Sequence, residues 1–153
     1  MYKFQFIVLL GFFFVILHSC SEDPIATDTG ALEAKNIIDL EYGSNTHQKY
    51  DIYLPKNRTT ETKVLILVHG GGWNAGEKSE MNPFKDFIRE QLSEIAVVNM
   101  NYRLADLNNP PYPMQIHDID QLVQELSNRA HEFQISKDIG FIGSSAGAHL
   151  SLL

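Results

Sequence analysis

Residues 139–150 read IGFIGSSAGAHL, and their character changes halfway along. Residues 139–143 are an apolar run of strand length, whereas AGAHL starts a helix-forming segment. Between them, Gly143-Ser144-Ser145-Ala146-Gly147 matches the pattern G-x-S-x-G. A serine placed there lies on a turn so sharp that the residues two before and two after it cannot carry side chains. Gly143 and Gly147 meet that demand, so the pattern predicts an exposed, nucleophilic Ser145 above the carboxyl edge of a sheet.

A second glycine-rich segment follows an earlier apolar run. Val64–Val68 is apolar at every position, as in a strand buried on both faces, and it leads directly into His69-Gly70-Gly71-Gly72-Trp73. Three consecutive glycines leave backbone N–H groups open to a ligand, which an oxyanion-stabilising loop requires. A flexible turn or a phosphate loop are the alternatives, and the spacing G-x-x-x-x-G-K-[ST] of a phosphate loop is absent here.

The rest of the chain from residue 36 alternates strand-length and helix-length patterns. Further strands are predicted at Ile37–Tyr42, Lys49–Leu54 and Ile95–Met100. One helix is predicted to start with Asn82 as its N-cap and Pro83 after it, and a second amphipathic helix follows the proline-rich loop at 101–113. The apolar faces of the two helices are Phe84, Phe87, Ile88 and Leu92 in the first and Ile116, Ile119, Val123 and Leu126 in the second. This order, β-β-β-α-β-α-β-α, predicts a mixed or parallel α/β sheet.

Three motifs resemble those of proteins with the α/β-hydrolase fold. They are HGGGW after the third strand, NYRLA after the fourth and GSSAGAHL after the fifth. The resemblance is strongest to HGGG-bearing esterases and lipases related to hormone-sensitive lipase and to bacterial acetyl- and feruloyl-esterases. It covers residues 37–153 and implies a mostly parallel sheet flanked by helices, with Ser145 as the nucleophile. It also implies that the backbone N–H groups of Gly71, Gly72 and Ala146 form the oxyanion hole, that His69 and Gly70 order the loop, and that no cofactor or metal is used.

A serine nucleophile needs a histidine base oriented by a carboxylate, and in this fold both follow the serine. No Asp or Glu follows Ser145, and the only later histidine is His149, on the same predicted helix. We expect His149 to have a packing role, because its ring is tied to the side of that helix. We therefore expect residues 36–153 to be the part of an α/β-hydrolase domain that ends after the nucleophile. Residues 139–142 would then form an unpaired apolar edge strand. We also expect the chain to be close to inactive alone.

The other candidate acid and base residues are interpreted as surface groups. The acidic ones precede the nucleophile and lie on the second predicted helix, where they are expected to face solvent or to cap the helix. The remaining histidines show no metal-ligand spacing. These residues are Asp118, Asp120, His47, His117 and His131.

The N-terminus carries an export signal. Lys3 supplies a positive charge, residues 6–17 are uninterruptedly apolar, and a run this short is a signal peptide's apolar region, not a membrane span. Leu17-His18-Ser19-Cys20 resembles the lipobox of bacterial lipoproteins. We therefore expect a signal peptide at 1–19, lipidation at Cys20 and a flexible tether at 20–35. The expected location is the outer membrane or cell surface of a Gram-negative bacterium. The alternative is a periplasmic or secreted protein.

Composition narrows the possible partners. The chain of 153 residues has a formal net charge of −7, which leaves no basic field to attract nucleic acid or an anionic membrane surface. The lone cysteine excludes an intrachain disulfide and a cysteine-built metal site.

The sequence thus predicts a serine carboxylic-ester hydrolase acting through an acyl-serine intermediate. Its expected substrate is a small-molecule or polysaccharide-linked ester, and its expected contact with a membrane is through a lipid anchor only. An arylformamidase-like amidase shares HGG-x-W and SAGAHL and is the alternative within enzymes. A non-catalytic surface lipoprotein, or a remnant, is the alternative outside them.

Overall fold

The computed structural model describes residues 31–153. The expected signal peptide, Cys20 and most of the expected tether therefore lie outside the described residues. The globular part is in contact with the chain from Leu32 onward: the Asn57 N–H donates to the Leu32 carbonyl at 2.7 Å, and Arg58 Nη1 donates to the Glu33 carbonyl at 2.6 Å. Two residues of the expected tether, Leu32 and Glu33, thus contact the globular part.

Five strands form one sheet in the order β1-β2-β4-β3-β5. Their bounds are Lys35–Glu41 (β1), Lys49–Leu54 (β2), Val64–Val68 (β3), Ala96–Met100 (β4) and Ile139–Gly143 (β5). The first two strands pair antiparallel, and β2 pairs antiparallel with β4, whereas β3 lies parallel between β4 and β5. The predicted mixed α/β sheet is confirmed.

The register of the three parallel strands brings their carboxyl ends together. Val68, the last residue of β3, is opposite Met100 at the end of β4 and opposite Gly143 at the end of β5. The segments that leave these strands start with His69, Asn101 and Ser144, so they meet at one edge of the sheet. The carboxyl edge of parallel strands is where open α/β sheets bind ligands.

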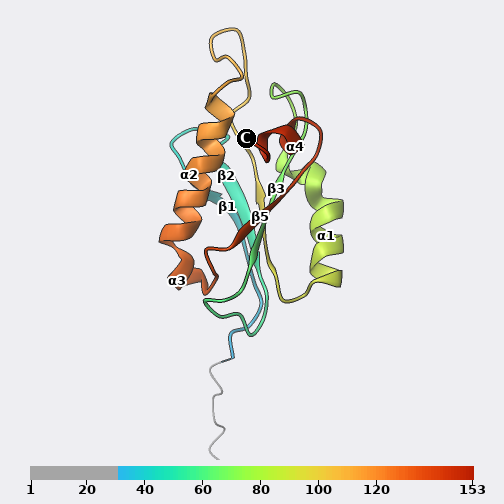
Figure 1. Cartoon of the computed structure of the whole chain (residues 1–153), viewed down its shortest axis with the longest axis vertical. Coiled ribbons are helices and arrows are strands. Elements are labelled where there is room, and N and C mark those ends of the chain that lie inside the picture. Colours follow the sequence, from blue (N-terminus) through green and yellow to red (C-terminus); the bar gives the residue numbers. More distant parts are fainter. Residues whose placement is uncertain (1–30) are drawn as a thin grey trace, which may run out of the picture.

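Helices cover both faces of the sheet (Figure 1). Helix α2 (Met114–Asn128) and the short α3 (Ala130–Phe133) lie on one face, and α1 (Asn82–Gln91), preceded by the 3-10 turn η1 (Lys78–Met81), lies on the other. The larger core packs Ile119, Leu122 and Leu126 of α2 against alternate strand residues, and the smaller one packs Ile88 of α1 and Met81 against Leu67 and Val97. Helix α4 (Ala146–Leu150) follows β5 directly.

Two expectations for α1 are wrong. The helix begins at Asn82, with Met81 in the N-cap position, because the η1 turn runs straight into it and Asn82 Oδ1 accepts a hydrogen bond from Asn99 Nδ2 at 3.4 Å. Of the predicted apolar face, only Ile88 is buried, whereas Phe84 and Phe87 are 52% and 63% exposed. Phe84 and Phe87 thus remain accessible among the described residues, although Phe84 lies one helical turn before the buried Ile88.

Strand β5 pairs only with β3 among the described residues, so its other edge is open there, as the sequence predicts. No helix within residues 31–153 is long and apolar enough to cross a bilayer. Nor does this part of the chain hold a cluster of three or more histidine, cysteine or carboxylate side chains that could bind a metal ion.

Candidate active site

Ser145 lies on a strained turn between β5 and α4. Its backbone has φ 49° and ψ −114°, a conformation that non-glycine residues adopt rarely and that clusters at functional sites. Its side chain is exposed. The flanking glycines are sterically required, because a Cβ on Gly143 would lie 2.3 Å from the Ala148 nitrogen and a Cβ on Gly147 would lie 2.2 Å from the Val68 carbonyl oxygen. This turn has the geometry that the G-x-S-x-G pattern predicts.

The glycine loop after β3 lies against this turn. A Cβ on Gly70 would be 3.4 Å from the Ser145 Cβ, so the two segments are in contact. Gly71 and Gly72 both have positive φ, at 102° and 58°, and the Gly71 carbonyl accepts hydrogen bonds from the N–H groups of Asn74 and Ala75. Within residues 31–153, the N–H groups of Gly71, Gly72 and Ala146 donate no hydrogen bond. The three expected oxyanion-hole donors are therefore free at this edge of the sheet.

His69 is buried beneath the loop and held in place. Its Nδ1 lies 2.8 Å from the Gly70 carbonyl oxygen, and its ring stacks on Tyr102 with centroids 4.1 Å apart. Burial lowers the pKa of His69 below its usual value, so the ring is neutral at pH 7 and Nδ1 is the protonated donor to Gly70. This surrounding fits a histidine that orders the loop, as the resemblance implies.

Tyr102 holds the start of the glycine loop, a role that the sequence analysis missed. Its fully buried hydroxyl donates to the carbonyls of His69 and Gly70, at 2.9 and 3.0 Å. Burial raises the pKa of Tyr102 to about 12, so the hydroxyl keeps its proton at neutral pH. The signal was the NYRLA motif, which the sequence analysis used for the resemblance but not for a contact.

The far end of the same loop is held by a group around Lys78. The Lys78 ammonium bonds Asp39 at 2.7 Å and also the carboxylate of buried Asp51. The Lys78 N–H donates to Asn101 Oδ1 at 2.6 Å, and Asn99 Nδ2 donates to the Lys78 carbonyl at 2.7 Å. These paired carboxylates raise the pKa of Lys78, although burial alone would lower it. The end of β4 thus fixes both ends of the loop, at Tyr102 and at Asn99 and Asn101.

His149 has the packing role that the sequence predicts. Its exposed ring stacks on Trp73 with centroids 5.5 Å apart, and Trp73 Nε1 donates to the Ala146 carbonyl at 3.3 Å. The pair joins the glycine loop to α4. Among the described residues, no histidine is hydrogen-bonded to Ser145 Oγ. His47, His117 and His131 are all exposed, as predicted.

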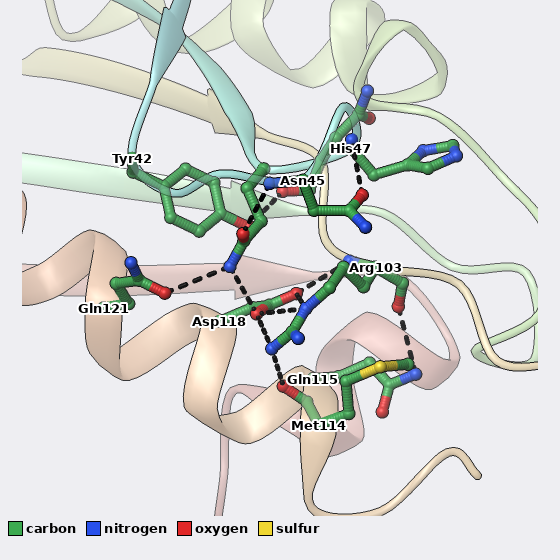
Figure 2. A network of polar contacts seen from close by, with 10 residues as sticks. Tyr42, Asn45, His47, Arg103, Met114, Gln115, Asp118 and Gln121 are labelled. Atoms are coloured by element: carbon green, nitrogen blue, oxygen red, sulfur yellow. Dashed lines mark hydrogen bonds and ion pairs between the residues drawn. The ribbon is translucent and has the colours of Figure 1, made fainter. Parts of the chain in front are cut away.

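The expectation that Asp118 faces solvent is wrong. Asp118 is fully buried and accepts hydrogen bonds from Arg103 Nε at 2.9 Å, from the Arg103 N–H at 2.8 Å and from Gln48 Nε2 at 2.9 Å (Figure 2). Helix α2 turns this carboxylate toward the segment after β4, where an arginine neutralises it. The carboxylate in turn raises the pKa of Arg103. Asp120, two residues further on, is exposed as predicted.

Solved structures of esterases share this fold. A truncated carbohydrate esterase from gut microbiota superposes with a TM-score of 0.64 and 27% identity over 78% of this chain and 42% of that one. Esterase B of Lactobacillus rhamnosis, solved with a phosphonate inhibitor, superposes with a TM-score of 0.59 and 28% identity. The match covers 77% of this chain and 38% of that one. The fold is therefore that of the α/β-hydrolases, and its structural relatives include carboxylic-ester hydrolases.

The family model named BD-FAE matches residues 50–153, and the chain belongs to that family. An Arabidopsis thaliana protein named "Probable isoprenylcysteine alpha-carbonyl methylesterase ICMEL1" is 32% identical over 72% of this chain and 22% of its own length. Kynurenine formamidase of Danio rerio is 25% identical over 83% of this chain and 41% of its own. The chain thus spans well under half the length of these curated relatives.

Proposed function

We propose that this chain carries the nucleophile and the oxyanion hole of a serine carboxylic-ester hydrolase. The observation that carries the proposal is the strained, exposed Ser145 in contact with a glycine loop whose N–H groups at Gly71 and Gly72 are free. Strain at a serine is retained where the surrounding structure enforces it, as the two flanking glycines do here. Free backbone donors beside such a serine suit the negative charge of an acyl-transfer intermediate.

In the proposed reaction, Ser145 Oγ attacks the ester carbonyl carbon and its proton passes to a base. The carbonyl oxygen becomes an oxyanion, which the N–H groups of Gly71, Gly72 and Ala146 stabilise. When the intermediate collapses, the bond to the alcohol oxygen breaks, and the alcohol leaves with the proton from the base. Water then attacks the acyl-serine in the same way and releases the carboxylic acid. Each oxyanion donor contributes roughly 3–4 kcal/mol to such a step.

The general base is a group other than the described histidines. None of them is hydrogen-bonded to Ser145, and the two nearest to the loop are engaged elsewhere, His69 with Gly70 and Tyr102 and His149 with Trp73. Loss of triad function in a serine hydrolase costs about a millionfold in turnover. We therefore expect the 153-residue chain to acylate slowly and not to turn over.

The test compares this chain with Ser145→Ala and with Ser144→Ala, the neighbouring exposed serine. Each protein is incubated with p-nitrophenyl acetate and, separately, with a fluorophosphonate, and the adduct is located by mass spectrometry. We expect p-nitrophenolate release near background and a slow, stoichiometric adduct on Ser145 in the starting protein and in Ser144→Ala. An adduct on Ser144, or none at all, would overturn the proposal in favour of a non-catalytic protein. Rapid turnover that Ser145→Ala abolishes would instead show that a base is present.

A formamide substrate is the second candidate, because two of the curated relatives are named kynurenine formamidases. The same serine and oxyanion donors serve an ester or a formamide, so geometry at Ser145 does not separate them. Acylation by phenyl acetate is therefore compared with formylation by formanilide. A faster reaction with formanilide would favour the amidase.

For the substrate's setting, we propose an exported protein that is lipidated at Cys20 and acts on carbohydrate-linked esters. Support comes from the apolar run at 6–17, from the lipobox-like tetrad and from the structural similarity to a carbohydrate esterase from gut microbiota. Palmitate labelling in a Gram-negative host that Cys20→Ala abolishes is the expected result. Unlipidated, cytosolic protein would contradict it.

A further inference from the structure

A polar cleft of about 440 Å³ lies beside the glycine loop, at the carboxyl edge of the sheet. Its walls are the turn between β1 and β2, residue 74 of the loop, the segment after β4 and the first residue of α2. Most of its lining side chains are polar, among them Asn45, His47, Asn74, Arg103 and Asn109. Its volume is within the roughly 300–1,000 Å³ range of small-ligand pockets, but those are mostly apolar, and this one is not.

Asn74 connects the cleft to the oxyanion hole. A Cβ on Gly72 would lie 3.7 Å from Asn74 Oδ1, so this amide is next to one of the expected oxyanion donors. Ala105, another lining residue, donates its N–H to the Trp73 carbonyl at 2.8 Å. The cleft therefore adjoins the loop whose N–H groups at Gly71 and Gly72 are the expected oxyanion donors.

Several hydrogen-bonding groups of the cleft are unengaged within residues 31–153. The side chains of Asn74 and His47 form no hydrogen bond there, and the Asn45 amide uses only its oxygen, which accepts from the His47 N–H at 2.9 Å. Arg103 bonds Asp118 through Nε and Nη2, which leaves Nη1 free. Figure 2 shows Asn45 and His47 on one side of Arg103, with Asp118 and Met114 of α2 on the other. The cleft thus offers both donors and acceptors.

The charge of the cleft disfavours an anionic ligand. Asp118 is fully buried against Arg103 at 2.5 Å and neutralises its charge. Asp106 adds a negative charge, since hydrogen bonds from Asn109 and from the N–H of Asn108 lower its pKa and keep it ionised. An anion would meet one uncompensated carboxylate and no uncompensated cation among these groups, whereas hydroxyl groups can both donate to and accept from the free amides.

We propose that this cleft binds the neutral, hydroxyl-rich part of the substrate, a sugar ring, and that Asn74, His47 and Arg103 Nη1 are its specificity-determining contacts. The proposal rests on the proposed function only for the statement that this sugar is part of an ester. Sugar binding itself needs neither Ser145 nor a base, so it can be measured on the chain as it is.

The experiment is an NMR titration of the full chain with methyl β-D-xylopyranoside and, as an anionic probe of similar size, methyl β-D-glucuronide. Asn74→Ala and His47→Ala are each compared with a matched exposed residue far from the cleft, Asn128→Ala and His131→Ala. We expect the neutral sugar to bind about tenfold more tightly than the glucuronide. We also expect a fivefold to tenfold loss of xyloside affinity in Asn74→Ala and in His47→Ala, as for one lost hydrogen bond.

Equal affinity for both probes, or an equal loss in the cleft variants and in their matched controls, would overturn the inference. Absence of sugar binding with an intact Ser145 adduct would overturn the inference and leave the proposed function standing. Sugar binding without any Ser145 adduct would overturn the proposed function and leave the cleft as a saccharide site.

Discussion

At the scale of single residues, the tightest contacts of the site are between backbones. Gly147 sits against the end of β3, where a Cβ would be 2.2 Å from the Val68 carbonyl oxygen, an atom that cannot move without breaking the sheet. Gly140 is also confined, but by the tip of the Leu65 side chain at 2.9 Å, which can rotate away. These two glycines therefore form a natural pair for comparison.

We expect Gly147→Ala to lower the free energy of unfolding by about 3 kcal/mol and Gly140→Ala to lower it by about 1 kcal/mol or less, because only the first forces backbone apart. Urea denaturation followed by circular dichroism measures both. Similar losses in the two variants would show that Gly147 is not tightly packed against the end of β3.

Tyr102 permits a second test at this scale. In Tyr102→Phe the ring can still stack on His69, but the carbonyls of His69 and Gly70 lose their buried donor. We expect a loss of about 1 to 3 kcal/mol in the free energy of unfolding. Tyr112→Phe is the control, since Tyr112 is 65% exposed, and it should change stability by less than about 0.5 kcal/mol. A neutral Tyr102→Phe would mean that another group holds the loop.

At the scale of elements, helix α2 shows why periodicity alone misplaces a charged residue. Asp118 and Asp120 are both acids on one helix, but Asp118 lies on the buried face with Ile119 and Leu122. Nothing in the pattern of α2 itself reveals that Arg103, on a separate segment, is there to pair with it. The same limit applies to Phe84 and Phe87 of α1, which the apolar pattern groups with the buried Ile88 but which are exposed among the described residues.

Asp118→Asn leaves Arg103 and Gln48 without the carboxylate that both donate to. We expect it to lower the free energy of unfolding by about 3 kcal/mol, in the range found when one partner of a buried ion pair is removed. Asp120→Asn, on the exposed side of the same helix, should stay within about 0.5 kcal/mol. Equal effects in thermal or urea unfolding would contradict the buried pair.

At the scale of the whole molecule, pH acts on stability through His69. Burial lowers the pKa of His69 in the folded protein below the roughly 6.5 of an unfolded chain. The unfolded state therefore binds the proton more readily, and stability is fully present above about pH 6.5 and falls as the pH drops from there toward the folded pKa. Asp39, Asp106 and Glu132 have lowered pKa values and titrate in a more acidic range.

We expect the urea midpoint of the starting protein to decrease when the pH is lowered from 7.5 to 5.5. His69→Phe, which can still stack on Tyr102, should have a lower urea midpoint at every pH. Its midpoint should no longer decrease between pH 7.5 and pH 5.5. His131→Ala, in which an exposed histidine is removed, should keep the decrease. A decrease that persists in His69→Phe would assign the effect to another group.

The sequence by itself determined the local geometry of this protein, because the signals there are steric and short-range. Alternating apolar runs set the strands, and Gly143 and Gly147 around Ser145 set a turn that only glycine-flanked serine can form. The glycines after Val68 likewise set a loop with accessible N–H groups. These features depend on residues within a few positions of one another, so they could be predicted.

Only the tertiary structure decided how the site is supported. The Tyr102 hydroxyl under the glycine loop, the Lys78 group at its far end and the Arg103 to Asp118 pair all join residues that are distant along the chain. Their partners are chosen by the β3, β4 and β5 register, which brings three strand ends to one edge. A buried charge or hydroxyl is tolerated only where that packing supplies a partner, and no local pattern encodes which partner it is.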